Sequence, residues 1–217
     1  MAGLMEKDFR ILMQRRQSLL IFVVIAVFLS VMQGGAFIVG YLPFISVTLA
    51  VSTISYDEFD NGYPFLLTLP ITRKSYVVEK YLFGLLTILC AWIPAVVLCC
   101  IIDGAKGVGT PVSETIFMSV AMLLVPVILM NLMIPLQLKY GSERSRVVIL
   151  AVMGILAIAI YAVVKLVQAI GMNTTAVWAD IEQISNEMIV LVFVAAGILA
   201  TLISMMISNR IMENKQL

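Results

Sequence analysis

The chain has 217 residues, of which 62% are hydrophobic and only 12% are charged, and its mean hydropathy is +1.07. A water-soluble domain of this size could not bury so much apolar surface, so these values exclude a soluble globular protein. Histidine is absent and the three cysteines share one apolar run. These counts argue against an intramembrane zinc protease, a Ser–His hydrolase, a metal site and a disulfide framework.

The first segment, residues 1–17, is predicted to form an amphipathic helix. Apolar residues recur at helical spacing along one face, at Met5, Phe9, Leu12 and Met13. Such a helix lies in the membrane interface and leads the chain into its first span. A solvated leader with chance periodicity is the alternative.

Six apolar runs follow, each near the length that a bilayer requires. They cover 18–32, 36–55, 82–102, 115–138, 147–170 and 188–208. One topology places twelve of the 14 Lys and Arg residues on the same side of the membrane. Because short loops rich in Lys and Arg stay in the cytoplasm, we predict an all-α protein with six spans and cytoplasmic termini. The whole chain, 1–217, forms one transmembrane domain.

The longest predicted cytoplasmic connection, residues 56–81, has the character of a docking surface. Acidic residues open it, a turn follows at Asn61-Gly62, and an apolar stretch runs up to Pro70. Thr72 can then cap a new helix, since its hydroxyl can accept a hydrogen bond from a first-turn amide. A plain connector needs only a handful of residues, so this segment predicts contact with a cytoplasmic partner.

Polar residues inside the spans are candidates for a substrate path or a dimer seam. Asn131 lies in mid-membrane and needs a partner, which is either substrate or a neighbouring helix. Tyr161, Lys165 and Gln168 share one face of the fifth span, which would line an outward cavity or the dimer seam. Snorkelling of the Lys165 ammonium to the membrane surface is the alternative.

The connection at 56–81 also resembles a known family. An acid-rich start, a glycine, Leu-Leu-x-Leu-Pro-Ile-Thr-Arg over 66–73, and a lysine entering the next span are similar to the first cytoplasmic loop of small ABC-2-type permeases. The resemblance implies a dimer with an identical or related permease, and separate ATPase subunits that bind ATP and Mg. Small size and the lack of a fused ATPase are similar to the bacterial plasma-membrane permeases that export phenol-soluble modulins, which are amphipathic peptides.

The resemblance also implies roles for residues. Coupling to the ATPase would fall to a helix in this loop and to six residues, Asp57, Glu58, Leu67, Pro70, Arg73 and Lys80. The loop at 139–146 would make a second, smaller contact through Glu143 and Arg144, with a positive-inside anchor as the alternative. The chain itself would be no enzyme and would bind no cofactor, and no nucleic-acid partner is expected.

Two other functions stay open at this point. An ion-coupled secondary transporter usually places a carboxylate deep in a span, whereas all 13 acidic residues here lie in loops or at span ends. A membrane protein that binds a cytoplasmic partner without transport is the second alternative. The sequence does not specify the substrate, the identity of the second permease, or whether export serves secretion or self-protection.

Overall fold

The computed structural model describes residues 2–59, 71–107, 111–169 and 186–215. Every regular element in these ranges is a helix, and five helical segments are long and apolar enough to cross a membrane. The predicted all-α membrane class is therefore confirmed.

The first half of the chain forms four helices. Arg15 alone separates the first two, and Gly34, at φ 121°, turns the chain into the third. The fourth is held at its start as predicted, because the Ser75 amide donates a hydrogen bond to Thr72 Oγ1 at 3.1 Å. Their bounds are Ala2–Gln14 (α1), Arg16–Gln33 (α2), Ala36–Glu58 (α3) and Arg73–Ala105 (α5).

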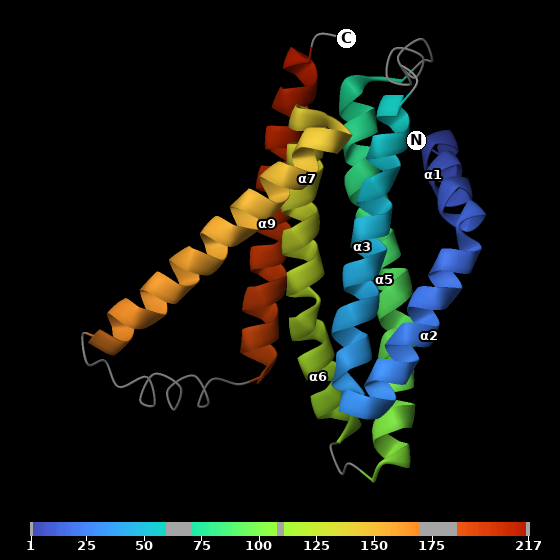
Figure 1. Cartoon of the computed structure of the whole chain (residues 1–217), viewed down its shortest axis with the longest axis vertical. Coiled ribbons are helices and arrows are strands. Elements are labelled where there is room, and N and C mark those ends of the chain that lie inside the picture. The colour runs from blue at the N-terminus through green and yellow to red at the C-terminus, as the bar shows by residue number, and fades with distance from the viewer. Residues whose placement is uncertain (1, 60–70, 108–110, 170–185, 216–217) are drawn as a thin grey trace.

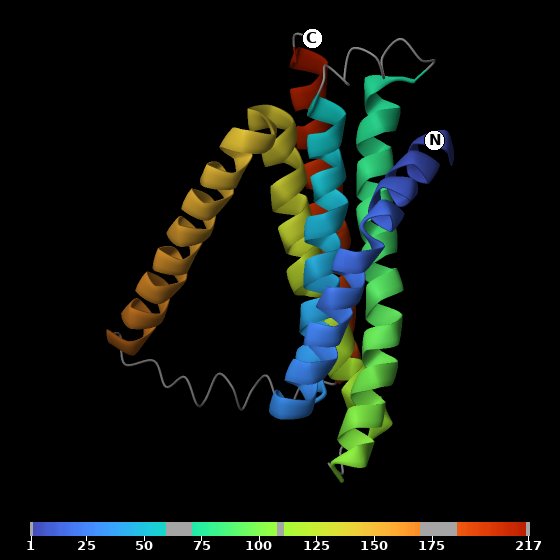
Figure 2. The same ribbon diagram turned by 45° about the vertical axis from the view of Figure 1, so that its right-hand side comes forward.

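The second half contains a reversal inside one long helix. It consists of α6 (Val112–Met122), α7 (Leu124–Ala169) and α9 (Asn186–Asn214). Gly141, at φ 77° and ψ 176°, breaks α7 into a first arm, 124–140, and a second arm, 142–169. Helix continues on both sides of this one residue, where the sequence suggests a loop over 139–146. The second arm diverges from the other helices in both views (Figures 1 and 2).

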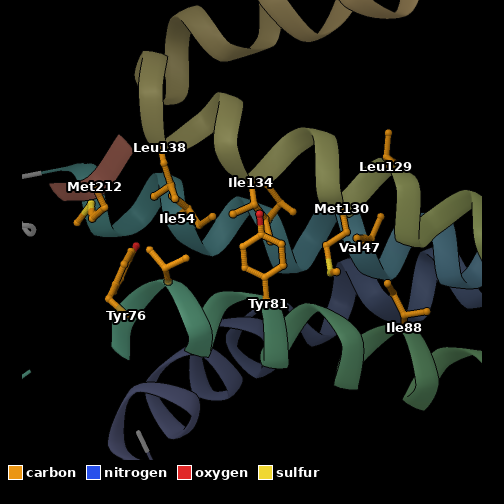
Figure 3. Packing of buried hydrophobic residues seen from close by; sticks show 12 residues of the cluster. Val47, Ile54, Tyr76, Tyr81, Ile88, Leu129, Met130, Ile134, Leu138 and Met212 are labelled. Atoms are coloured by element: carbon orange, nitrogen blue, oxygen red, sulfur yellow. The ribbon is translucent and has the colours of Figure 1, made fainter. Parts of the chain in front are cut away.

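The main core lies where α3, α5, the first arm of α7 and α9 meet (Figure 3). At Gly84 in α5, an added Cβ would lie 2.6 Å from the Met130 sulfur, so the missing side chain lets α5 and α7 approach closely. The core residues include Val47, Ile54, Tyr81, Ile88, Met130, Ile134, Leu138 and Met212. A second cluster joins α2, α3 and α5.

Both ends of the described chain lie toward one end of the bundle. Helix α1, the end of α3, the start of α5, the break in α7 and the end of α9 meet there (Figure 1). We call this region the charged end, because the ionic contacts described below gather in it.

Candidate functional site

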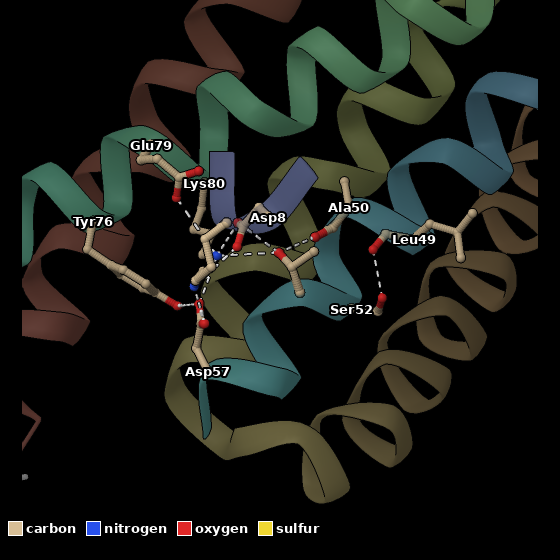
Figure 4. Close-up of polar contacts among 10 residues, drawn as sticks. Asp8, Leu49, Ala50, Ser52, Asp57, Tyr76, Glu79 and Lys80 are labelled. Atoms are coloured by element: carbon tan, nitrogen blue, oxygen red, sulfur yellow. Dashed lines mark hydrogen bonds and ion pairs between the residues drawn. The ribbon is translucent and has the colours of Figure 1, made fainter. Parts of the chain in front are cut away.

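Lys80 of α5 is the centre of a buried ionic network at the charged end (Figure 4). The residue is only 3% exposed and lies against α1 and α3. Its ammonium donates a hydrogen bond to Asp8, lies 2.8 Å from Asp57 Oδ2 and lies 3.3 Å from Thr53 Oγ1. An ammonium has three donors, and these three acceptors can use all of them.

The two aspartates have further partners, which tie α1 to the bundle. Lys7 of α1 donates to Asp57 and lies 3.2 Å from Asp8 Oδ1. The Tyr76 hydroxyl donates to Asp57 Oδ2 at 2.9 Å, and Thr53 Oγ1 lies 3.1 Å from Asp8 Oδ2. Charged residues from three helices thus contact one another, and all of them except the partly exposed Lys7 are buried.

Glu79 is a third buried carboxylate in this network, and its contacts are poorer. It is fully buried and lies 3.8 Å from Lys80, but neither of its oxygens accepts a hydrogen bond from the described residues. Three carboxylates therefore face the two ammonium groups of Lys7 and Lys80. Removing either cation would leave a buried negative charge without compensation.

Asp8 was not a candidate from the sequence, because a single acidic residue beside the apolar stripe of α1 is typical of the polar side of an amphipathic helix. The structure turns Phe9 and Met13, 55% and 50% exposed, away from the bundle, and it buries Leu4 and Asp8. These two buried residues are four apart, so they share a helix face. The sequence did contain a signal for this buried face, because the acidic residue Asp8 lies on the same helix face as Leu4.

Three of the residues predicted to couple to an ATPase, Asp57, Arg73 and Lys80, make contacts between helix ends within this chain. Asp57 and Lys80 lie inside the network, and Arg73 Nη1 donates to the Met212 and Glu213 carbonyls at 3.1 and 2.8 Å. Leu67 and Pro70 lie outside the described residues. Direct contact of Asp57 or Lys80 with a partner would require the network to open, and their coupling role stays a prediction.

Glu58 and the second predicted contact meet at the break in α7. Glu58 Oε2 accepts a hydrogen bond from the Ser142 amide at 2.5 Å. The next two residues, Glu143 and Arg144, are exposed. Lys215 donates to the Leu138 carbonyl at 3.2 Å; burial lowers the pKa of this lysine, and the nearby Glu58 carboxylate opposes that shift.

Replacing Gly141 by alanine is expected to destabilise the protein by about 1–3 kcal/mol, since φ 77° with ψ 176° is a region nearly exclusive to glycine. The added Cβ would also meet the Glu58 carboxylate. Thermal unfolding in detergent measures this, with Gly154→Ala as the control. Gly154 lies in the helical second arm with open space around it, so alanine there stabilises slightly. Equal unfolding temperatures for the two variants would contradict the assigned backbone constraint.

Asn131 contacts a neighbouring helix. Pro135 has no N–H, so it frees the Asn131 carbonyl four residues earlier. Ser204 of α9 donates to this carbonyl at 2.5 Å, and Asn131 Nδ2 donates to Thr201 Oγ1 at 3.0 Å. The structure thus shows the helix-packing contact, and contact with substrate stays a prediction.

The other predicted path residues lie on the second arm of α7. Tyr161 is 65% exposed, Lys165 is also exposed, and the Lys165 ammonium lies 5.8 Å from the Tyr161 ring centre. The side chain of Gln168 lies outside the described residues. Tyr161 and Lys165 therefore share a face of the second arm, as predicted from their spacing.

An apolar groove of about 440 Å³ runs between α5, α6, the first arm of α7 and α9. Tyr81 and Thr201 are the polar residues among its described lining, and neither carries a charge at neutral pH. The Tyr81 hydroxyl is already bonded to Ser204 and Ser208, at 2.6 and 2.8 Å. Such a groove suits an apolar ligand with few polar groups. No local sequence pattern indicates this groove, because its lining comes from four separate helices.

Comparison with protein-family models identifies the family of the chain. A family model described as "ABC-2 family transporter protein" matches residues 3–213, nearly the whole chain. No curated protein and no solved structure matches the chain at a significant level.

Proposed function

The chain belongs to the ABC-2 transporter family, and from this membership we propose that it is the permease subunit of an ABC exporter. Members of this family are the membrane component of the transporter and are not themselves catalytic. Separate ATPase subunits bind ATP and Mg and hydrolyse the nucleotide in the cytoplasm. A second permease, identical or related, completes the transporter. The family match over 3–213 is the observation that carries this proposal.

We further propose six crossings of a bacterial plasma membrane. The helical segment Val112–Val167 has 56 residues, whereas one crossing needs roughly 20. Its reversal at Gly141 supports counting it as two crossings, which with the other four candidate segments makes six. The Lys and Arg residues concentrated at the charged end favour a cytoplasmic location for that end.

The buried network gives this permease a way to transmit movement. Residues 60–70 connect α3 to α5 in the sequence, and Asp57 and Lys80 join these two helices by an ion pair. Asp8 adds α1 to the same unit. A partner that moves this segment during its nucleotide cycle would therefore move three helices together rather than one loop.

The apolar groove supports an amphipathic or hydrophobic substrate. None of its described lining residues is acidic, which disfavours an ion-coupled transport site there. Leu124, Val127 and Gly197 on its walls offer apolar contact to one face of a helical peptide or to an acyl chain. We propose that such compounds enter the groove from the bilayer and leave on the outer side.

The test is ATP hydrolysis by this chain purified together with a candidate ABC ATPase subunit from the same genome and reconstituted in liposomes, each such ATPase being tried in turn. We expect stable association and a several-fold stimulation by an amphipathic helical peptide. A scrambled peptide of equal composition but no apolar face is the control. Failure to associate would remove the ABC permease proposal, whereas association without a peptide response would remove only the substrate class.

A further inference from the structure

The reversal of α7 at Gly141 creates two helix ends whose backbone groups need partners. The last carbonyls of a helix and its first amides have no partner within the helix itself. Here Lys215 donates to the Leu138 carbonyl at the end of the first arm, and Glu58 accepts from the Ser142 amide at the start of the second. These partners lie 77 and 84 residues away in the sequence, at the ends of two other helices.

The signs of both charges match the helix dipoles. A helix carries partial positive charge at its N-terminus and partial negative charge at its C-terminus. The Glu58 carboxylate meets the N-terminus of the second arm, and the Lys215 ammonium meets the C-terminus of the first. Helices α3 and α9 therefore brace the reversal electrostatically from two directions.

The lack of a side chain at Gly141 lets the Glu58 carboxylate pack against the turn. A Cβ at Gly141 would meet the Glu58 carboxylate group, so the carboxylate packs directly against the turn backbone. Glu58 is half-buried and its Oε2 is already hydrogen-bonded. At least one of its two carboxylate oxygens is therefore occupied by the turn.

We propose that Glu58 is a positioning residue that fixes the second arm of α7 through the Ser142 amide, and does not act by contacting the ATPase. Glu58 is the last residue of α3, immediately before the segment from which the ATPase contact is expected. Ser142 immediately precedes the second expected contact, Glu143 and Arg144. The brace thus makes the two contact regions move together, a consequence that rests on the proposed permease function; the brace itself does not.

Hydrogen exchange of the permease alone tests the brace without any ATPase. In Glu58→Ala we expect the Ser142 amide and the first amides bonded within the helix, those of Ser145 and Arg146, to exchange about tenfold faster, since opening of the turn no longer breaks a charge-assisted hydrogen bond. Glu6→Gln, at an exposed glutamate of α1, is the control and should leave these amides unchanged. Unchanged exchange in Glu58→Ala would overturn the brace, whether or not the chain is a permease.

Ser142→Pro removes the donor while keeping Glu58, although the proline Cδ replaces the amide hydrogen and displaces the carboxylate from it. Proline is well tolerated at the first position of a helix, so the backbone of the second arm accepts this variant. We expect the amides of Ser145 and Arg146 to exchange about tenfold faster in this variant too. Protection equal to wild type would overturn the brace.

A double-mutant cycle in the complex separates positioning from direct contact. We expect Glu58→Ala and Ser142→Pro each to lower peptide-stimulated hydrolysis several-fold while association with the ATPase is retained. The double variant should be no worse than either single variant, because both remove the same hydrogen bond. Multiplied losses, or loss of association in Glu58→Ala alone, would assign Glu58 to the ATPase surface and overturn the proposal.

Discussion

Lys80→Met is expected to destabilise the protein by about 3–5 kcal/mol, because it leaves buried carboxylates with too few cations. Methionine fills a similar volume, so the loss is electrostatic rather than a cavity. Asp8 and Asp57 would share Lys7 alone, while Glu79 would lose its nearest positive charge. In thermal unfolding of the detergent-solubilised protein this corresponds to a fall of about 6–20 °C.

Lys74→Met is the matched control for this experiment. Lys74 begins the same helix, is 71% exposed and contacts Glu213 at 3.4 Å on the surface. Surface pairs of this kind contribute about 0–1 kcal/mol, so its unfolding temperature should stay close to wild type. Adding Asp8→Asn to Lys80→Met should recover part of the loss, because it removes one uncompensated charge. Equal unfolding of the two methionine variants would show that the network contributes little to stability.

Gly197→Phe is expected to weaken stimulation by amphipathic peptides while the permease still associates with its ATPase. Gly197 lines the apolar groove, and a phenyl group there would occupy space proposed for the substrate. We expect the peptide concentration for half-stimulation to rise about tenfold or more, equivalent to about 1.4 kcal/mol of binding free energy. Phosphate release from the reconstituted complex, titrated with peptide, measures the effect.

Gly197→Ala controls for the loss of glycine itself. A Cβ there would contact Leu124 and Val127 at 3.8 and 3.9 Å, which is ordinary packing distance. The alanine variant should therefore respond to peptide like the wild type. A well-folded Gly197→Phe variant with normal stimulation would exclude the groove as the binding site and leave the permease class intact.

The helical membrane class could be predicted because it depends on quantities that are local in the sequence. Each apolar run favours the bilayer through its own residues, and the Thr72 cap acts over three positions. The helix at the N-terminus also followed from spacing alone. The contact of its other face with the bundle did not follow from spacing, since Leu4 and Asp8 are buried there while Phe9 and Met13 are exposed.

The burial of the charged residues at the span ends could not be predicted from the local sequence. Asp57 and Lys80 looked like surface residues because a charge at the end of a span usually reaches water. Whether such a charge reaches water depends on which other segment packs over it. Here α1 packs over Lys80, and Asp8, 72 residues away in the sequence, accepts a hydrogen bond from the Lys80 ammonium. No property of the sequence around Lys80 indicates this neighbour.

Composition, hydropathy and charge distribution by themselves determined that this is a helical membrane protein and where its apolar runs lie, because each segment interacts with the bilayer independently of the others. Only the tertiary structure decided that Lys80 is buried among carboxylates and that Glu58 holds the turn of α7. It alone also placed the apolar groove between helices distant in sequence. These features depend on the distances between distant segments, which packing sets and no local pattern specifies.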